Sequence, residues 1–202
     1  MEFQPNFRNI ADAAANKKPA RLPLYEHSIS VNVIEDITDS KIAELLESDT
    51  ADLDQYFNVY CNFFRDCTFD TVTFEYCVVN TLPPGGALKG GKGPVQTRQD
   101  FENFPWDNLK QRYWQIAGPH FDALCRNIPE GMKAIGGIGN GIFEIIEDLV
   151  GLEYLGYMQV DQPDVFKDLF ERVGTVLNEI WQDFLEKYSP HYCVCRFGDD
   201  LG

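Results

Sequence analysis

Five side chains with acid–base or nucleophilic chemistry fall where extended, apolar runs of the sequence end. They are His27, Glu75, Cys77, Asp199 and Asp200. A histidine or a carboxylate can move protons to and from a substrate, and a cysteine thiolate is a nucleophile. Enzymes built on parallel strands place such groups at the carboxyl ends of the strands. We therefore predict these five residues as the catalytic candidates.

A second set of residues beside the same ends is suited to holding a substrate. The turn at Gly136–Gly141 is rich in glycine, although it lacks the spacing of a dinucleotide fingerprint. Glycines between a strand and a helix let a ligand approach the backbone, and the amino end of the helix favours an anion. Tight packing of the turn is the alternative explanation. The predicted binding residues are Tyr25, Tyr76, Gly139, Asn140 and Arg196.

Structural roles are the competing explanation for several of these side chains. His27 also suits a hydrogen-bonded structural histidine, and Asp199 and Asp200 suit a solvated acidic turn. The three histidines of the chain are far apart in sequence, so we predict no metal site from this chain. The six cysteines are irregularly spaced and include no CxxC, which predicts buried, reduced thiols.

A glycine-rich segment at Gly86–Lys92 matches the first part of a phosphate-binding loop. That motif continues with a serine or threonine and then a helix. Here Gly93 and Pro94 follow, and a proline disfavours the helical conformation of the residue before it. We predict a loop or hairpin over residues 83–94 and no nucleotide site.

The candidate residues need strands that end at a common edge. Runs of β-branched, aromatic and glycine residues predict four strands, at residues 21–27, 69–79, 133–138 and 192–197. Apolar residues at helical spacing predict helices around them, at residues 6–16, 39–47, 50–65, 106–127, 142–150 and 161–188. Asp161 is expected to cap the last helix, and Gly118-Pro119 to disturb the helix that contains it.

This alternation predicts one α/β domain with parallel strands joined by right-handed crossovers. About four parallel strands with covering helices correspond to a partial (β/α)8 TIM barrel, and a full barrel typically needs about 250 residues. The 202-residue chain is therefore interpreted as a truncated barrel. A small open, doubly wound sheet is the alternative.

The charge of the chain excludes several classes of partner. The formal net charge is −15 and the sequence has no basic patch, so neither nucleic acid nor an anionic membrane surface is an expected partner. The amino-terminal segment lacks the layout of a signal peptide, and no apolar run approaches the length of a membrane span. A cytoplasmic location is the expectation.

The order of several motifs resembles the uroporphyrinogen decarboxylase superfamily, which also contains corrinoid-dependent methyltransferases. The motifs are Asn6-Phe-Arg-Asn, Arg21-Leu-Pro-Leu-Tyr, Phe69-Asp-Thr-Val-Thr-Phe, the Gly-Lys-Gly that ends at Pro94, Ile135-Gly-Gly-Ile-Gly-Asn-Gly and Arg196-Phe-Gly-Asp-Asp-Leu-Gly. The resemblance implies that residues 1–202 are the N-terminal half of such a barrel domain. It further implies a decarboxylase-like lyase of tetrapyrrole and porphyrin biosynthesis.

Three positions depart from the decarboxylase pattern. Ser28 stands where the family has a substrate-gripping arginine, and Cys77 stands where it has an essential aspartate, with Glu75 two residues earlier. A catalytic-site tyrosine of the family falls near Glu147. The resemblance therefore leaves two alternatives to a tetrapyrrole decarboxylase.

The first alternative is a fragment of a corrinoid- and zinc-dependent methyltransferase, and the second is a non-catalytic, self-associating half-barrel. No cofactor is expected in this chain itself. Zinc and a corrinoid are implied for a full-length methyltransferase-like version, because the family's histidine and cysteine zinc ligands lie in the second half of the barrel. The expected partners are a small-molecule or corrinoid-protein substrate, and either a second copy of the chain or a C-terminal half.

Overall fold

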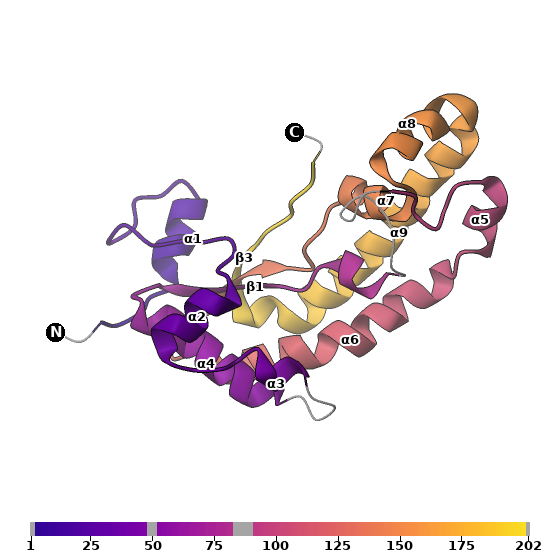
Figure 1. The fold of residues 1–202 in the computed structure, drawn as a ribbon. Helices are drawn as coiled ribbons and strands as arrows, with labels where there is room; N and C mark the ends of the chain where they lie inside the picture. Colours follow the sequence, from indigo (N-terminus) through magenta and orange to yellow (C-terminus); the bar gives the residue numbers. More distant parts are fainter. Residues whose placement is uncertain (1–2, 48–51, 83–90, 201–202) are drawn as a thin grey trace. The chain divides into compact units, whose positions relative to one another are not determined.

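The computed structural model describes residues 3–47, 52–82 and 91–200, and it divides into two compact units. The first unit contains residues 1–75, 117–137 and 187–196. The second contains residues 76–116, 138–186 and 197–202. Figure 1 shows the helices and strands and labels α1–α9, β1 and β3.

A parallel sheet lies in the first unit. Its strands are β1 (Thr71–Glu75), β2 (Lys133–Gly137) and β3 (Tyr192–Cys195), in the order β1-β2-β3. The α/β class and the parallel pairing are thus confirmed, but the described residues form three strands where four were predicted. β1 is also shorter than the predicted strand at 69–79, because the chain turns into a 3-10 helix, η1 (Val78–Thr81), soon after Glu75.

Helices cover the sheet of the first unit (Figure 1). α4 (Leu53–Asp66) packs on β1 and α1 (Arg8–Ala14) packs on β3. The contact between α4 and β1 is aromatic, with the rings of Phe57 and Phe74 meeting edge to face at 4.9 Å. Such pairs add about 0.5–1.5 kcal/mol beyond the burial of their area. The sequence predicts both strands and both helices, because the composition of a strand and the apolar spacing of a helix are encoded locally.

Two shorter helices of the first unit replace the single helix predicted at residues 39–47. They are α2 (Val31–Thr38) and α3 (Glu44–Glu47), and both contact α4. Asp39 ends α2 with a left-handed φ of 50°, a conformation that terminates a helix. The prediction placed a helix start at the residue that in fact ends one.

The strand predicted at residues 21–27 is wrong, since the structure assigns no strand or bridge to them. Leu22 is 87% exposed, so the run does not alternate between a buried and a solvated face. Pro23 also lacks the N–H that a ladder needs. We call residues 21–27 the strap. It follows β1 through side-chain contacts, which join Arg21 to Asp70, Glu26 to Thr73 and His27 to Glu75.

The second unit is helical. It holds η1, α5 (Arg98–Asn103), residues 106–116 of α6 (Trp106–Asn127), α7 (Ile142–Val150), α8 (Leu152–Asp161) and residues 163–186 of α9 (Pro163–Tyr188). A last 3-10 turn, η3 (Ser189–His191), belongs to the first unit and leads into β3.

Three predictions about these helices need correction. α8 was not predicted, and Asp161 is its last residue rather than the cap of α9. Gly151 separates α7 from α8 with a φ of 91°, which only glycine adopts readily. The assigned helix α6 runs through Pro119 without interruption. The predicted loop at 83–94 lies mostly outside the described residues.

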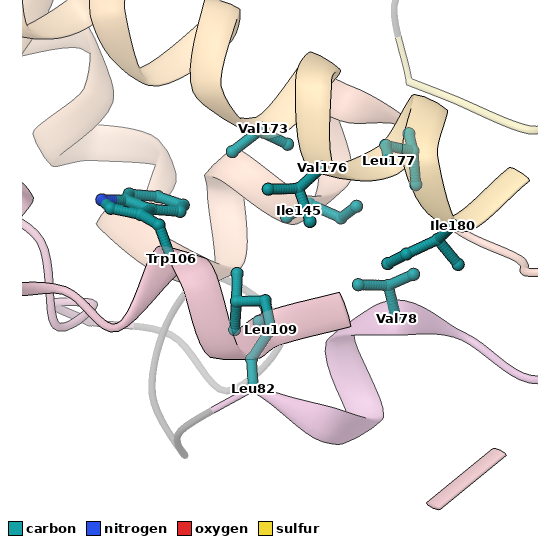
Figure 2. A pocket seen from close by; sticks show the side chains of 9 residues that line it. All are labelled: Val78, Leu82, Trp106, Leu109, Ile145, Val173, Val176, Leu177 and Ile180. Atoms are coloured by element: carbon teal, nitrogen blue, oxygen red, sulfur yellow. The ribbon is translucent and has the colours of Figure 1, made fainter. Parts of the chain in front are cut away.

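The apolar side chains of the second unit enclose a cavity of about 10 Å³, room for one water-sized molecule. Figure 2 shows side chains from η1, α6, α7 and α9 pointing toward one another around it. The lining is Val78, Leu82, Trp106, Leu109, Ile145, Val173, Val176, Leu177 and Ile180. A space this small and apolar is a packing defect of a core, not a substrate pocket.

Candidate active site

Three candidate side chains meet at the carboxyl end of β1, within the first unit. Arg196 Nη1 donates to both carboxylate oxygens of Glu75, at 3.1 and 3.3 Å. His27 Nε2 lies 3.5 Å from Glu75 Oε1. The Glu75 side chain is 17% exposed, whereas those of His27 and Arg196 are 45% and 36% exposed. We call these three residues the strand-end cluster; its carboxylate is sheltered while its imidazole and guanidinium reach solvent.

Glycines in β2 make room for the cluster. Gly137 pairs with Glu75 in the register of the sheet, so a side chain at 137 would project from the same face, between β1 and β3. Gly136 has a φ of 134°, and a Cβ there would clash with the backbone oxygen of Phe74. Strands two places apart are about 10 Å from each other. The long Arg196 side chain therefore reaches Glu75 across β2, where that strand carries only Gly136 and Gly137.

The cluster has the parts of an acid–base pair. A carboxylate beside an imidazole orients the ring and stabilises its protonated form. Nε2 is the ring nitrogen that faces Glu75, at 3.5 Å, so Nδ1 is the nitrogen left to meet a substrate. Arg196 balances the charge of Glu75. Tyr25, two residues before His27, is 43% exposed, and its binding role stays a prediction.

Other candidates belong to the second unit and make structural contacts there. Cys77 lies beyond β1, as the residue before η1, so it does not share a strand face with Glu75. Gly139 packs against it so closely that a Cβ would clash with the Cys77 Sγ. Asn140 Oδ1 accepts from the Val79 backbone N–H at 3.3 Å, and Nδ2 donates to Glu144 at 3.0 Å. These contacts favour the packing explanation of the turn.

Tyr76 also lies in the second unit. Its backbone oxygen accepts a hydrogen bond from the Tyr113 hydroxyl at 2.9 Å, and partial burial raises the pKa of its own phenol. The ring of Tyr76 lies 6.4 Å from that of Tyr113. Its part in substrate binding stays a prediction.

Asp199 caps helix α7. Its two carboxylate oxygens accept from the backbone N–H of Phe143 at 3.1 Å, and one also accepts from Glu144 at 3.2 Å. Gly141 carries no side chain at the point where a Cβ would strike the Asp199 carboxylate. A carboxylate cap satisfies helix N–H groups and contributes about 1 kcal/mol. Asp199 thus has a structural role here, and Asp200 beside it is exposed.

Four carboxylates gather at this end of α7, those of Glu144, Glu147, Asp199 and Asp200. Partial burial raises the pKa of Glu147, and Asp200, Glu144 and Asp199 raise it further by repulsion. A carboxyl whose pKa is raised by folding destabilises the folded state once it ionises. The contribution of this carboxyl to the free energy of unfolding is therefore favourable at low pH, and it is lost as the pH rises through the raised pKa.

Glu147→Gln is expected to make the protein more stable than wild type at pH 7, by about 0.3 kcal/mol because a partly exposed charge is screened. The gain should vanish below the ordinary pKa of a glutamate, where Glu147 is protonated. Urea unfolding of both proteins from pH 3.5 to 7.5 measures the difference. In an Asp200→Asn background the gain should shrink, because one source of repulsion is gone. A gain that grows toward low pH would contradict this account.

Zinc does not fit the described residues. Over residues 3–47, 52–82 and 91–200, no group of three or more His, Cys, Asp or Glu side chains is arranged to hold a metal ion. The six cysteines all lie in the described ranges and form no disulfide with one another; Cys61 is buried as predicted, Cys195 is exposed, and the other four are partly buried. Burial raises the pKa of Cys193 to about 11 and that of Cys125 to about 12, which disfavours the thiolate that a metal binds.

Sequence reasoning missed the residues that support the cluster. The buried Thr73 hydroxyl donates to the backbone oxygen of Glu26 at 2.8 Å, next to His27. The Tyr60 hydroxyl donates to the backbone oxygen of Thr73 at 2.7 Å. Thr73 lies two residues before Glu75 and hence on the same strand face. This spacing of two residues is the sequence signal that could have identified Thr73 as a neighbour of the cluster.

Comparisons with known proteins bear on the fold. No family model and no curated protein sequence matches the chain. Among solved structures, the chain is similar to a methyltransferase from Methanosarcina mazei, with a TM-score of 0.68 and 11% sequence identity. The match covers 95% of this chain and 58% of that one, so the chain spans little more than half the length of that methyltransferase. A likeness at this identity shows a shared fold.

A helix that spans a membrane must be about 20 residues long and mostly apolar. None of the helices of the described residues is both long enough and apolar enough to cross a bilayer.

Proposed function

We propose that the chain forms part of the catalytic domain of a methyltransferase, and that its three strands belong to a (β/α)8 barrel. The observation that supports this most is the fold likeness to a methyltransferase over 95% of the chain. The ordered motifs that resemble the uroporphyrinogen decarboxylase superfamily add support, because that superfamily includes methyltransferases. The likeness favours this alternative over the decarboxylase.

The strand-end cluster supplies the acid–base chemistry that such a transfer needs. The acceptor's lone pair forms the new bond to the methyl carbon, and the bond from that carbon to the donor breaks with its electron pair left on the donor. The acceptor's proton passes to Nδ1 of His27. Glu75 stabilises the imidazolium that results, and Arg196 holds Glu75 in place. Acid–base groups of this kind contribute about 10²–10⁴-fold to rate.

Decarboxylation of a polycarboxylate substrate receives less support from the site. Such a substrate needs cations to pair with its carboxylates. Arg196 is already paired with Glu75, and Ser28 stands where the family has an arginine. The net charge of −15 adds long-range repulsion.

The test is a methyl-transfer assay with the full chain. Methylcobalamin serves as the methyl donor, because a corrinoid-protein substrate is one of the partners expected from the sequence. Small alkyl thiols serve as acceptors, with and without added Zn²⁺. Mass spectrometry follows the methylated thiol. We expect product above the protein-free rate. Absence of product in every combination, or release of CO₂ from uroporphyrinogen by the same protein, would overturn the proposal.

A further inference from the structure

The strap is held along β1 by side chains at three points. Arg21 Nη2 donates to the buried carboxylate of Asp70 at 2.6 Å, near the start of β1. The Thr73 hydroxyl donates to the Glu26 backbone oxygen at 2.8 Å, at mid-strand. His27 meets Glu75 at 3.5 Å, at the carboxyl end. We call the contacts at Asp70 and Thr73 anchors of the strap. The Thr73 anchor holds Glu26, the residue directly before His27, whereas the Asp70 anchor holds Arg21.

The Thr73 anchor acts directly on the backbone of His27. A peptide unit is planar, so the Glu26 carbonyl, the His27 nitrogen and the His27 Cα lie in one rigid plane. Fixing the carbonyl oxygen of Glu26 therefore fixes where the His27 side chain begins.

Thr73 is itself fixed. Its side chain is buried, with the residue 5% exposed. Its backbone oxygen accepts from the hydroxyl of Tyr60, on α4, at 2.7 Å. Burial raises the pKa of the Tyr60 phenol strongly, so this hydroxyl stays a donor at any physiological pH. Thr73 and Glu75 share a strand face, so the anchor and the partner of His27 keep a constant spacing.

We infer that Thr73 is a positioning residue, which sets His27 beside Glu75 by holding the Glu26 carbonyl. The importance of this positioning for function rests on the proposed role of His27. The test does not depend on that role, because it follows the His27 ring itself. Losing a hydrogen bond of this kind shifts an equilibrium about fivefold. Without the hydroxyl, His27 should spend correspondingly less time against Glu75.

The test compares Thr73→Val with Thr73→Ser. Valine keeps the bulk of threonine without its hydroxyl, and serine keeps the hydroxyl without the methyl group. If Thr73 acts by packing alone, serine is the more disturbed variant; if it acts by positioning, valine is. The readout is the ¹H–¹³C NMR signal of the His27 ring, which is one of three histidine signals and is assigned by its loss in His27→Asn.

Glu75→Gln supplies the reference position for a His27 ring without its carboxylate. We expect the His27 signal of Thr73→Val to move toward that position and the signal of Thr73→Ser to stay at the wild-type one. Thr73→Ala gives the same comparison should the valine variant not fold. An unmoved signal in the variants that lack the hydroxyl, or an equal movement in Thr73→Ser, overturns the inference.

A methyl-transfer readout separates this inference from the proposed function. In an active protein, Thr73→Val should lower kcat about fivefold, with Thr73→Ser near wild type. A wild-type protein without methyl-transfer activity rejects the proposed function, while the NMR comparison still decides on Thr73. Full activity together with an unmoved His27 signal in Thr73→Val rejects the positioning role alone.

Discussion

Glu75→Gln is expected to lower kcat for methyl transfer about 100-fold, with a smaller change in KM. The carboxylate lies within 3.5 Å of His27 and accepts from Arg196, so its charge stabilises the imidazolium that forms when the acceptor loses its proton. Glutamine keeps the shape of the side chain but loses that charge. His27→Asn should cost at least as much, because it removes the proton acceptor. Steady-state kinetics with a methylated thiol as product measures both.

A matched control uses the same change of carboxylate to amide elsewhere. Glu130 is exposed in the turn before β2, at the opposite end of the sheet from the strand-end cluster. Glu130→Gln should retain the wild-type kcat. Circular dichroism checks that each variant is folded. Wild-type kcat in a folded Glu75→Gln variant would remove Glu75 from the proposed mechanism.

Asp70→Ala is expected to lower the free energy of unfolding by about 3–4 kcal/mol. The Asp70 carboxylate is fully buried next to the first residue of β1. It accepts from the backbone N–H of Asn6 at 2.7 Å, from the Asn9 side chain at 3.1 Å and from Arg21 at 2.6 Å. Removing it leaves the buried Asn9 amide without this acceptor and releases both the amino-terminal segment and the strap. Buried donors that lose an acceptor cost their full desolvation penalty.

Urea unfolding followed by circular dichroism measures this loss. Asp66→Ala is the control, because Asp66 pairs on the surface with Arg65 and its side chain is 64% exposed. That variant should stay within about 0.5 kcal/mol of wild type. An Asp70→Ala protein within 1 kcal/mol of wild type would show that the amino-terminal segment is not held by this carboxylate.

Local patterns were enough to locate most elements. The aromatic, β-branched run at Thr71–Glu75 and the glycine-containing run at Lys133–Gly137 are strands, and the amphipathic stripe of α9 is a helix. In each case the residues that decide the conformation lie within a turn or a pleat of one another, so their spacing alone carries the information. The boundaries at Asp39 and Asp161 were misplaced, because an acid can sit at either end of a helix.

The candidate residues were found by their position after strands, but their roles needed the tertiary structure. Asp199 and Glu75 look alike in sequence, as acids near strand ends. One caps α7, and the other pairs with Arg196, 121 residues away along the chain. Which partner a carboxylate meets depends on the register of three strands and on the bare glycines of β2.

The strap shows the same division. Its composition was that of a strand, and it does run beside β1, as a strand would. Its exposed leucine and its proline leave it attached through Asp70, Thr73 and Glu75 instead of through a backbone ladder. Sequence by itself determined most of the helices and the three strands that form, because that choice depends largely on near neighbours. Only the tertiary structure decided which side chains meet, because contacts between distant segments depend on how the whole chain packs.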